Sequence, residues 1–261
     1  MKTVLGMPTL VELHDLQANA TMASELGLDF VEMNLDCPAY LPERLPAEVV
    51  RQIGEESGLA FTVHLPEKLD LAVFQSKIRR GQLDFLAEVL HWTAEAGIEL
   101  VNMHLNEGVY FTLPDRRLWL YEAYREDFLS SLMESFRELS QLASRNRTRL
   151  CIENLGRQNP TSRQALKSLL QLQGVYLTYD VGHDAEADFC FLAFVEEHAE
   201  RLAHMHLHDF DGRSSHQTLF SGTVNIPRMI ALAQRLNLRV VVETKTVASL
   251  RESVRRLHTS L

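Results

Sequence analysis

Short β-rich runs alternate with helical segments along the whole chain, and this alternation limits the fold more than any other feature. We predict eight strands: Val4–Met7, Phe30–Leu35, Ala60–Leu65, Leu100–His104, Arg149–Glu153, Val175–Asp180, Leu202–His206 and Arg239–Glu243. Between them, apolar residues recur at helical spacing, for example in segments 85–93 and 128–139. Several of these segments run into a glycine just before the next strand, which is typical of a helix C-terminus.

Eight strand–helix units in 261 residues, with no linker or charge block between them, predict a (β/α)8 TIM barrel in the α/β class. We expect residues 1–261 to form one such domain. A doubly wound open sheet is the alternative. No G-x-G-x-x-G follows the first strand, which argues against a dinucleotide-binding version of that sheet.

Composition excludes several classes of function. The formal net charge of −9 argues against sequence-independent binding of DNA or RNA, which needs a basic surface. The cysteines Cys37, Cys151 and Cys190 are odd in number and show no C-x-x-C spacing, so we expect no disulfide framework and a cytoplasmic location. We find no signal peptide and no apolar run of the length that spans a membrane. A homo-oligomer is left open.

Six consecutive predicted strands end in a side chain that can bind a metal. These residues are His64, His104, Glu153, Asp180, His206 and Glu243. In a TIM barrel the carboxyl ends of the strands meet at one mouth, where the active site lies. Carboxylates crowded there without a cation would be costly, and imidazole with carboxylate suits zinc, manganese or iron. We therefore expect a metal centre.

Each residue taken alone has a plainer interpretation. A single histidine at a strand end is more often a hydrogen-bonded rim residue, and a single glutamate is more often solvated. In the run HMHLHD, alternation puts His204, His206 and His208 on one face of a strand, and we interpret His204 as a buried supporting or packing residue. Other small or polar residues lie one step below the strand ends: Glu32, Asn34, Thr62, Asn102, Cys151 and Thr178. Such residues either orient ligands or form a polar layer inside the barrel.

At this point the sequence resembles the xylose-isomerase-like barrels, a group that includes sugar isomerases, sugar epimerases and the endonuclease IV class of apurinic-site endonucleases. The stretches that carry the resemblance are VHLPEKL, VNMHLNEG, CIENLG, YDVGHD, HLHDFDG, SSHQTLFSG and VVETKT. They occur in the family's order between Phe61 and Thr246.

The resemblance implies particular ligands. The single-metal site of the sugar enzymes corresponds here to Glu153, Asp180, His206 and Glu243, with His183 near the substrate. The endonuclease branch binds up to three ions with further histidines, and the matching positions here are His64, His104, His183 and His216. One aspartate of that branch is replaced by Ser214. We therefore expect two divalent ions (Zn, Mn or Fe) and leave a third open.

The favoured hypothesis is metal-dependent hydrolysis of a phosphoester or phosphodiester in a small molecule, with a metal-activated water. Glu153 would bridge two ions, with His64 and His104 on the second. A looser resemblance to the cobamide-remodelling phosphodiesterases, prompted by NMHLNEGVYFTLPDRRLWL, suggests the nucleotide loop of a cobamide as substrate. The predicted substrate-binding residues are Lys68, Asn106, Tyr110, Arg116, His208, Asp209 and Lys245. For Arg116, a place on the outer surface is the alternative.

Two other functions are left open. A sugar or sugar-phosphate isomerase or epimerase needs only the four shared ligands and His183, with Glu153 and Glu243 as the acid–base pair. A metal-bearing binding protein without catalysis is suggested only by Ser214.

Overall fold

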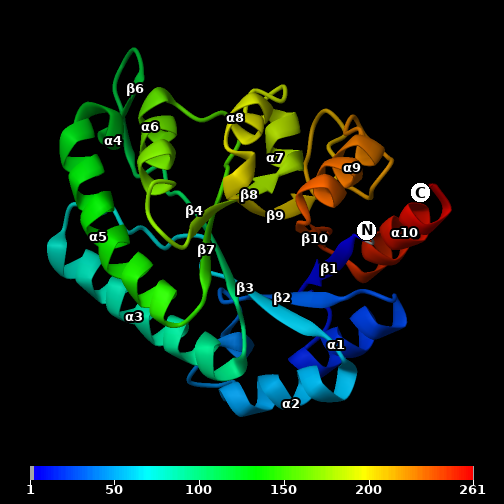
Figure 1. The fold of residues 1–261 in the computed structure, drawn as a ribbon. Helices are drawn as coiled ribbons and strands as arrows, with labels where there is room; N and C mark the ends of the chain where they lie inside the picture. Colours follow the sequence, from blue (N-terminus) through cyan, green and yellow to red (C-terminus); the bar gives the residue numbers. More distant parts are fainter. Residues whose placement is uncertain (1–2, 261) are drawn as a thin grey trace.

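The computed structural model describes residues 3–260 of the protein. Eight parallel strands form a closed barrel in the order β1-β10-β9-β8-β7-β4-β3-β2 (Figure 1). The barrel strands are β1 Val4–Pro8, β2 Phe30–Asn34, β3 Ala60–His64, β4 Leu100–His104, β7 Arg149–Glu153, β8 Val175–Asp180, β9 Leu202–Leu207 and β10 Arg239–Val242.

Pairing of the first strand with the last closes the sheet. In β1, Val4 lies opposite Arg239 of β10, and Gly6 lies opposite both Val241 of β10 and Phe30 of β2. A doubly wound sheet has two free edges, so this closure excludes it. The predicted (β/α)8 barrel is confirmed. Each predicted strand is present, and its ends agree with the prediction to within one residue.

Helices surround the barrel and bury its outer face (Figure 1). The longer ones are α1 Leu16–Glu25, α2 Ala47–Ser57, α3 Ser76–Ala96, α5 Arg125–Arg145, α6 Pro160–Leu169, α9 Ile226–Leu236 and α10 Val247–Ser260. The shorter ones are η1 Pro38–Tyr40, α4 Leu120–Ala123, α7 Val181–Glu186, α8 Leu192–Glu197 and η2 Ala199–Arg201. The segments 85–93 and 128–139 lie within α3 and α5, as predicted. Gly58 and Gly97 end α2 and α3 in the left-handed conformation.

The barrel interior changes from apolar to polar along its axis. Near the amino ends of the strands, Phe30, Leu100 and Cys151 are almost fully buried. Two residues further along β2 and β4 come the buried polar side chains of Glu32 and Asn102. Because side chains two apart on a strand share a face, β2 and β4 each carry a polar group above an apolar one. The metal-capable residues therefore lie on a buried polar layer rather than at an open surface.

The segment after β4 contains short strands that were not among the eight we predicted. It contains an antiparallel hairpin, β5 Tyr110–Thr112 and β6 Arg117–Trp119, in which Tyr110 pairs with Trp119. The Arg117 guanidinium lies 4.6 Å from the centre of the Tyr110 ring, so the hairpin is held by its own side chains. It projects at the edge of the molecule beside α4 (Figure 1).

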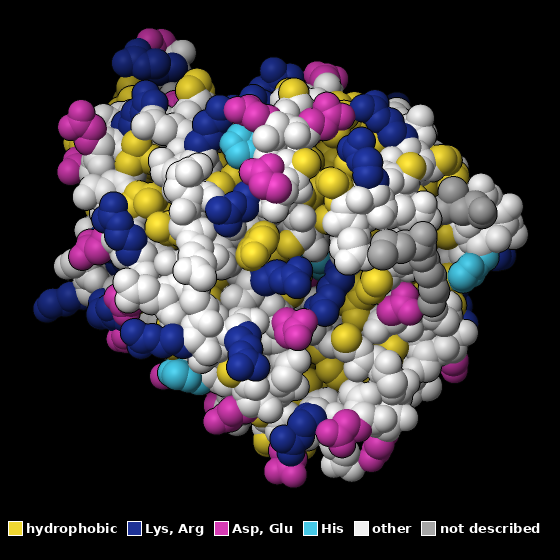
Figure 2. All heavy atoms as spheres, viewed as in Figure 1, with side chains coloured by type: hydrophobic (Ala, Val, Ile, Leu, Met, Phe, Trp, Pro, Cys, Tyr) yellow, Lys and Arg dark blue, Asp and Glu magenta, His cyan; other side chains and the backbone are white. Residues whose placement is uncertain are grey.

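Two further observations concern the surface. No helix among residues 3–260 is both long enough and apolar enough to cross a membrane. Figure 2 shows Lys and Arg side chains interspersed with Asp and Glu, and no continuous basic band crosses this face.

The contact between Gly6 and Phe30 gives a test of the barrel base. A Cβ at position 6 would lie 2.6 Å from atoms of the buried Phe30 ring, so Gly6→Ala should lower the free energy of unfolding by about 1–3 kcal/mol. Gly81→Ala is the control, since Gly81 lies within α3 with nothing near its added methyl group, and it should raise that free energy by about 0.5–1 kcal/mol. Urea denaturation measures both. Equal stability of the two variants would contradict this packing.

Candidate metal centre

Four neighbouring strands bring four potential ligands to one mouth of the barrel. Glu153 ends β7, Asp180 ends β8, His206 is the next-to-last residue of β9, and Glu243 follows β10. Asp180 lies directly opposite His206 in the β8–β9 pairing. The closed parallel register therefore places these side chains together, although they come from segments far apart in the sequence.

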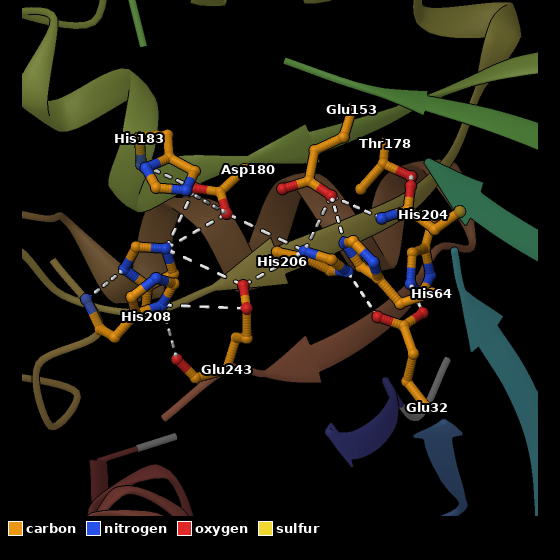
Figure 3. Close-up of polar contacts among 12 residues, drawn as sticks. Glu32, His64, Glu153, Thr178, Asp180, His183, His204, His206, His208 and Glu243 are labelled. Atoms are coloured by element: carbon orange, nitrogen blue, oxygen red, sulfur yellow. Dashed lines mark hydrogen bonds and ion pairs between the residues drawn. The ribbon is translucent and has the colours of Figure 1, made fainter. Parts of the chain in front are cut away.

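The Nδ1 atom of His206 lies at the centre of this group. It is 3.2 Å from Oε2 of Glu243, 3.3 Å from Oε2 of Glu153 and 3.9 Å from Oδ2 of Asp180. Figure 3 shows the carboxylates pointing toward this imidazole from several directions. All four residues are buried. We call these four residues the primary cluster.

Two atoms of the primary cluster have unsatisfied hydrogen-bonding capacity. Among the described residues, neither Nδ1 of His206 nor Oε2 of Glu243 has a hydrogen-bond partner, and both atoms are buried. An unpaired buried polar atom costs about 1–3 kcal/mol. Ligand atoms about 2.0–2.2 Å from one cation lie roughly 3 Å apart, which is close to the separation of these two atoms. The primary cluster thus fits a divalent cation in both chemistry and spacing.

The surrounding charges keep two of the carboxylates ionised. Burial alone would raise the pKa of Glu153, but the charges of His206 and His104 outweigh burial and hold this pKa well below its ordinary value. Burial also acts against ionisation of Glu243, whose pKa is nevertheless held low by His206 and by Lys245. The Lys245 Nζ lies 2.7 Å from Oε1 of Glu243. Both carboxylates are therefore in the form that binds cations and accepts protons.

Two more of the predicted histidines contact Glu153. The Nε2 atoms of His64 and His104 each lie 3.4 Å from one of its carboxylate oxygens. The two imidazoles meet edge to face, with ring centres 5.0 Å apart. From below, the Asn102 side-chain amide donates a hydrogen bond to the same carboxylate. The structure thus places both histidines beside the primary cluster.

A second group of three histidines lies on the other side of Asp180. His208 is fully buried, with Nε2 3.1 Å from Oδ1 of Asp180, and its Nδ1 accepts the backbone N–H of His216 at 2.9 Å. The His183 ring lies 5.4 Å from that of His208 and 5.5 Å from that of His216. Burial lowers the pKa of His216 to about 4, so its imidazole is neutral at pH 7. This group could also hold a metal ion.

A cavity of about 160 Å³ opens over the primary cluster. Its walls include Glu153, Glu243, His64, His104, His183, His216, Lys245, Thr9, Leu10, Val11 and Cys37. Sequence reasoning missed the last four, which follow β1 and β2. Their position just beyond strand ends was the available indication, but Thr9, Leu10 and Val11 are not typical metal ligands, and Cys37 was considered only as a disulfide partner.

The predicted substrate-binding residues divide into two sets. Lys245 lines the cavity, and His208 lies buried beneath it behind Asp180. The other predicted residues are not among the described residues that line the cavity: Lys68, Asn106, Tyr110, Arg116 and Asp209.

Three of these five residues make contacts within their own segments instead of lining the cavity. Arg116 is exposed on the hairpin and pairs with Asp115, so the alternative of an outer-surface position describes it. Asn106 accepts the N–H of Gly108 within its own loop. Asp209 is fully buried, and its two oxygens accept four backbone N–H groups, those of Phe210, Ser221, Gly222 and Val224.

Comparison with known proteins gives a consistent set of relatives. The uncharacterized protein MJ1614 of Methanocaldococcus jannaschii is 23% identical over 255 residues, which cover 92% of this chain and 91% of that protein. The solved structure of a D-tagatose 3-epimerase-like protein superposes with a TM-score of 0.79 at 17% identity, covering 98% of this chain and 96% of that one. The 3-keto-D-glucoside 4-epimerase YcjR of E. coli gives 0.78 at 20% identity, covering 99% and 100%.

These comparisons correct the predicted reaction. The prediction of phosphodiester hydrolysis, with a cobamide as substrate, is wrong, because the similar solved structures are mostly sugar epimerases and isomerases. They favour the alternative that we left open. The physical reason lies in the cavity: of the described residues that line it, Lys245 is the one lysine or arginine, and it already pairs with Glu243. Little is left there to bind a phosphate.

The family itself follows from the sequence. The model of the xylose isomerase-like TIM barrel matches residues 20–259, nearly the whole chain. With the closed barrel and the grouped strand-end residues, this match shows that the chain belongs to the xylose isomerase-like TIM barrel family.

Proposed function

We propose that this protein is a divalent-metal-dependent epimerase or isomerase of a small, uncharged sugar, acting as a single TIM barrel domain. The observation that carries the proposal is the primary cluster, in which three carboxylates surround the unpaired Nδ1 of His206. Several similar solved structures are epimerases of ketoses or ketoglycosides by name, which supports the same class of reaction.

One cation would be held by Glu153, Asp180, His206 and Glu243. A set of three carboxylates and one imidazole suits manganese best among the metals that we considered, since carboxylates favour harder ions. When bound, such a cation polarises a substrate carbonyl and so acidifies the neighbouring C–H bond.

Glu153 and Glu243 would move the proton. They belong to β7 and β10, which are separated in the barrel by β8 and β9, so the two carboxylates reach the cavity from different sides. One, as the ionised base, would accept a proton from a substrate carbon; the other, which first takes up a proton from water, would return it to the opposite face, and this inverts that carbon. Positioned acid–base groups of this kind contribute about 10²–10⁴-fold to a rate.

The rest of the cavity fits a neutral polyol. His183, His216 and Lys245 line it and offer hydrogen-bonding groups for hydroxyls, while Leu10 and Val11 give it an apolar side. With a single lysine and no arginine in the described lining, the cavity favours an uncharged sugar over a phosphorylated one. The predicted cytoplasmic location and homo-oligomer stay predictions.

Metal binding has a direct thermal test. Adding Mn²⁺ to metal-free protein should raise Tm, because the cation satisfies the unpaired atoms of the native state only; free metal at 1,000 times Kd corresponds to about 4 kcal/mol. EDTA should reverse the shift. Asp180→Asn should reduce the rise in Tm. The control Asp84→Asn should not, because Asp84 is exposed and pairs with Arg80 away from the site.

Elemental analysis should find one ion per chain. Two ions per chain would contradict a single site and support the two ions expected from the sequence. An unchanged Tm on adding Mn²⁺ would contradict the metal centre.

Solvent exchange tests the reaction. We expect the Mn²⁺-loaded protein in D₂O to incorporate deuterium at a carbon next to the carbonyl of a ketose from a panel, as detected by NMR. Glu153→Gln and Glu243→Gln should each slow this exchange at least about 100-fold, because each removes a proton-transfer group.

The matched control for that exchange is Glu138→Gln, which alters a carboxylate on α5 that pairs with Arg80 at the surface. It should exchange at the wild-type rate. A metal-loaded wild type that labels no sugar, or a Glu153→Gln variant as fast as wild type, would overturn the proposed reaction.

A further inference from the structure

A buried carboxylate lies beneath the primary cluster and belongs to none of its strands. Glu32 on β2 is 1% exposed and reaches across the barrel interior toward β9. Its Oε1 lies 2.8 Å from Nε2 of His206, and its Oε2 lies 2.8 Å from Nε2 of His204. Figure 3 shows Glu32 below His206, on the side away from Asp180 and Glu243.

A third donor completes this arrangement. The hydroxyl of Thr62, on the neighbouring strand β3, donates to Oε2 of Glu32 at 3.0 Å. Thr62 and His204 are fully buried, so water does not compete for these bonds. A buried, uncompensated carboxylate is costly, and three converging donors offset this cost.

The directions of these hydrogen bonds fix the imidazoles. An ionised carboxylate only accepts hydrogen bonds, so each imidazole that contacts Glu32 through Nε2 must carry its proton there. When Nδ1 of His206 binds a cation, the imidazole is neutral and its one proton lies on Nε2, where Glu32 accepts it. Nδ1 is the atom that faces Glu153, Asp180 and Glu243.

We propose that Glu32 is a positioning residue of the metal centre: it holds His206 in the Nε2–H form and in the ring orientation that presents Nδ1 to the cation. His204 and Thr62 in turn hold Glu32 in place. The inference deepens the proposed function and rests on its metal site. It explains why β9 carries a second buried histidine two residues before His206, one that is not among the described residues lining the cavity.

The same geometry shows why Glu32, His204 and His206 are not themselves a metal site, although their ligand atoms lie close together. The atoms that converge there are already engaged in two hydrogen bonds of 2.8 Å. A cation between them would have to displace both imidazole protons.

The first measurement uses the wild-type protein. In Zn²⁺-loaded protein labelled with ¹⁵N-histidine, the ring signals of His206, assigned by their loss in His206→Gln, should report a proton on Nε2 and a metal-bound Nδ1 without one. A proton on Nδ1 would overturn the proposal. This readout needs no substrate, and it is made on the wild-type protein; the variant serves only to assign the signals.

The second measurement is the affinity for Mn²⁺, followed by the EPR signal of the free ion. Glu32→Gln keeps the size of the side chain but removes its charge and one of its two acceptors, so affinity should fall about 10–100-fold, as is usual when the partner of a metal-binding histidine is lost. Thr62→Val removes one donor to Glu32 without touching His206 and should have a smaller effect. Ser135→Ala, which removes a buried hydrogen bond to Leu71 away from the site, should have none.

The outcomes separate this inference from the proposed function. A folded Glu32→Gln variant with wild-type affinity for Mn²⁺ would overturn the role of Glu32. Failure of every sugar to exchange deuterium, with tautomer and affinity as expected, would overturn the proposed reaction and leave the positioning role intact.

Discussion

Closing the barrel concentrates charge, and the rest of the site depends on how the chain compensates it. Glu153, Asp180 and Glu243 are buried around one imidazole, and Glu32 is buried beneath it. Several carboxylates buried together repel one another and lose hydration. Two histidines compensate this charge: Nε2 of His204 and of His206 hydrogen-bonds Glu32, and Nδ1 of His206 faces the carboxylates above. Imidazole suits both sides because its two nitrogens differ.

This compensation explains the order of residues inside the barrel. An interior filled by Val, Ile and Leu would be more stable by packing alone. Here Glu32, Asn102 and Thr178 occupy the middle of the barrel, and each is hydrogen-bonded to a neighbour on another strand. The Thr178 hydroxyl donates a hydrogen bond to the side-chain oxygen of Asn102. The side-chain NH₂ of Asn102 in turn donates to Glu153, so this layer orients the carboxylate above it. This polar layer packs less favourably than an apolar one would, but its hydrogen bonds hold the carboxylate of Glu153 in place.

The sequence predicted the features that depend on local periodicity. Strand ends and helix ends follow from apolar spacing and glycine positions, which is why Glu153, Asp180 and His206 could be placed at one mouth before the structure was known. The partnership of Glu32 with His206 could not be predicted in the same way, because the two residues are 174 positions apart and only the closed register makes them neighbours. The β5–β6 hairpin was missed because its two strands are three residues each and have no long apolar pattern.

The reaction was the least predictable part, and the reason is physical. Histidines and carboxylates at strand ends specify that a cation can bind, but a bound cation assists both hydrolysis and proton transfer. What separates these reactions is the charge that the cavity offers to the substrate. Arg116 was predicted to bind substrate, but it lies exposed in the β5–β6 hairpin and pairs with Asp115. Charge on a loop therefore predicts a ligand only when the conformation of the loop is also known, and for this segment the periodicity carried no such information.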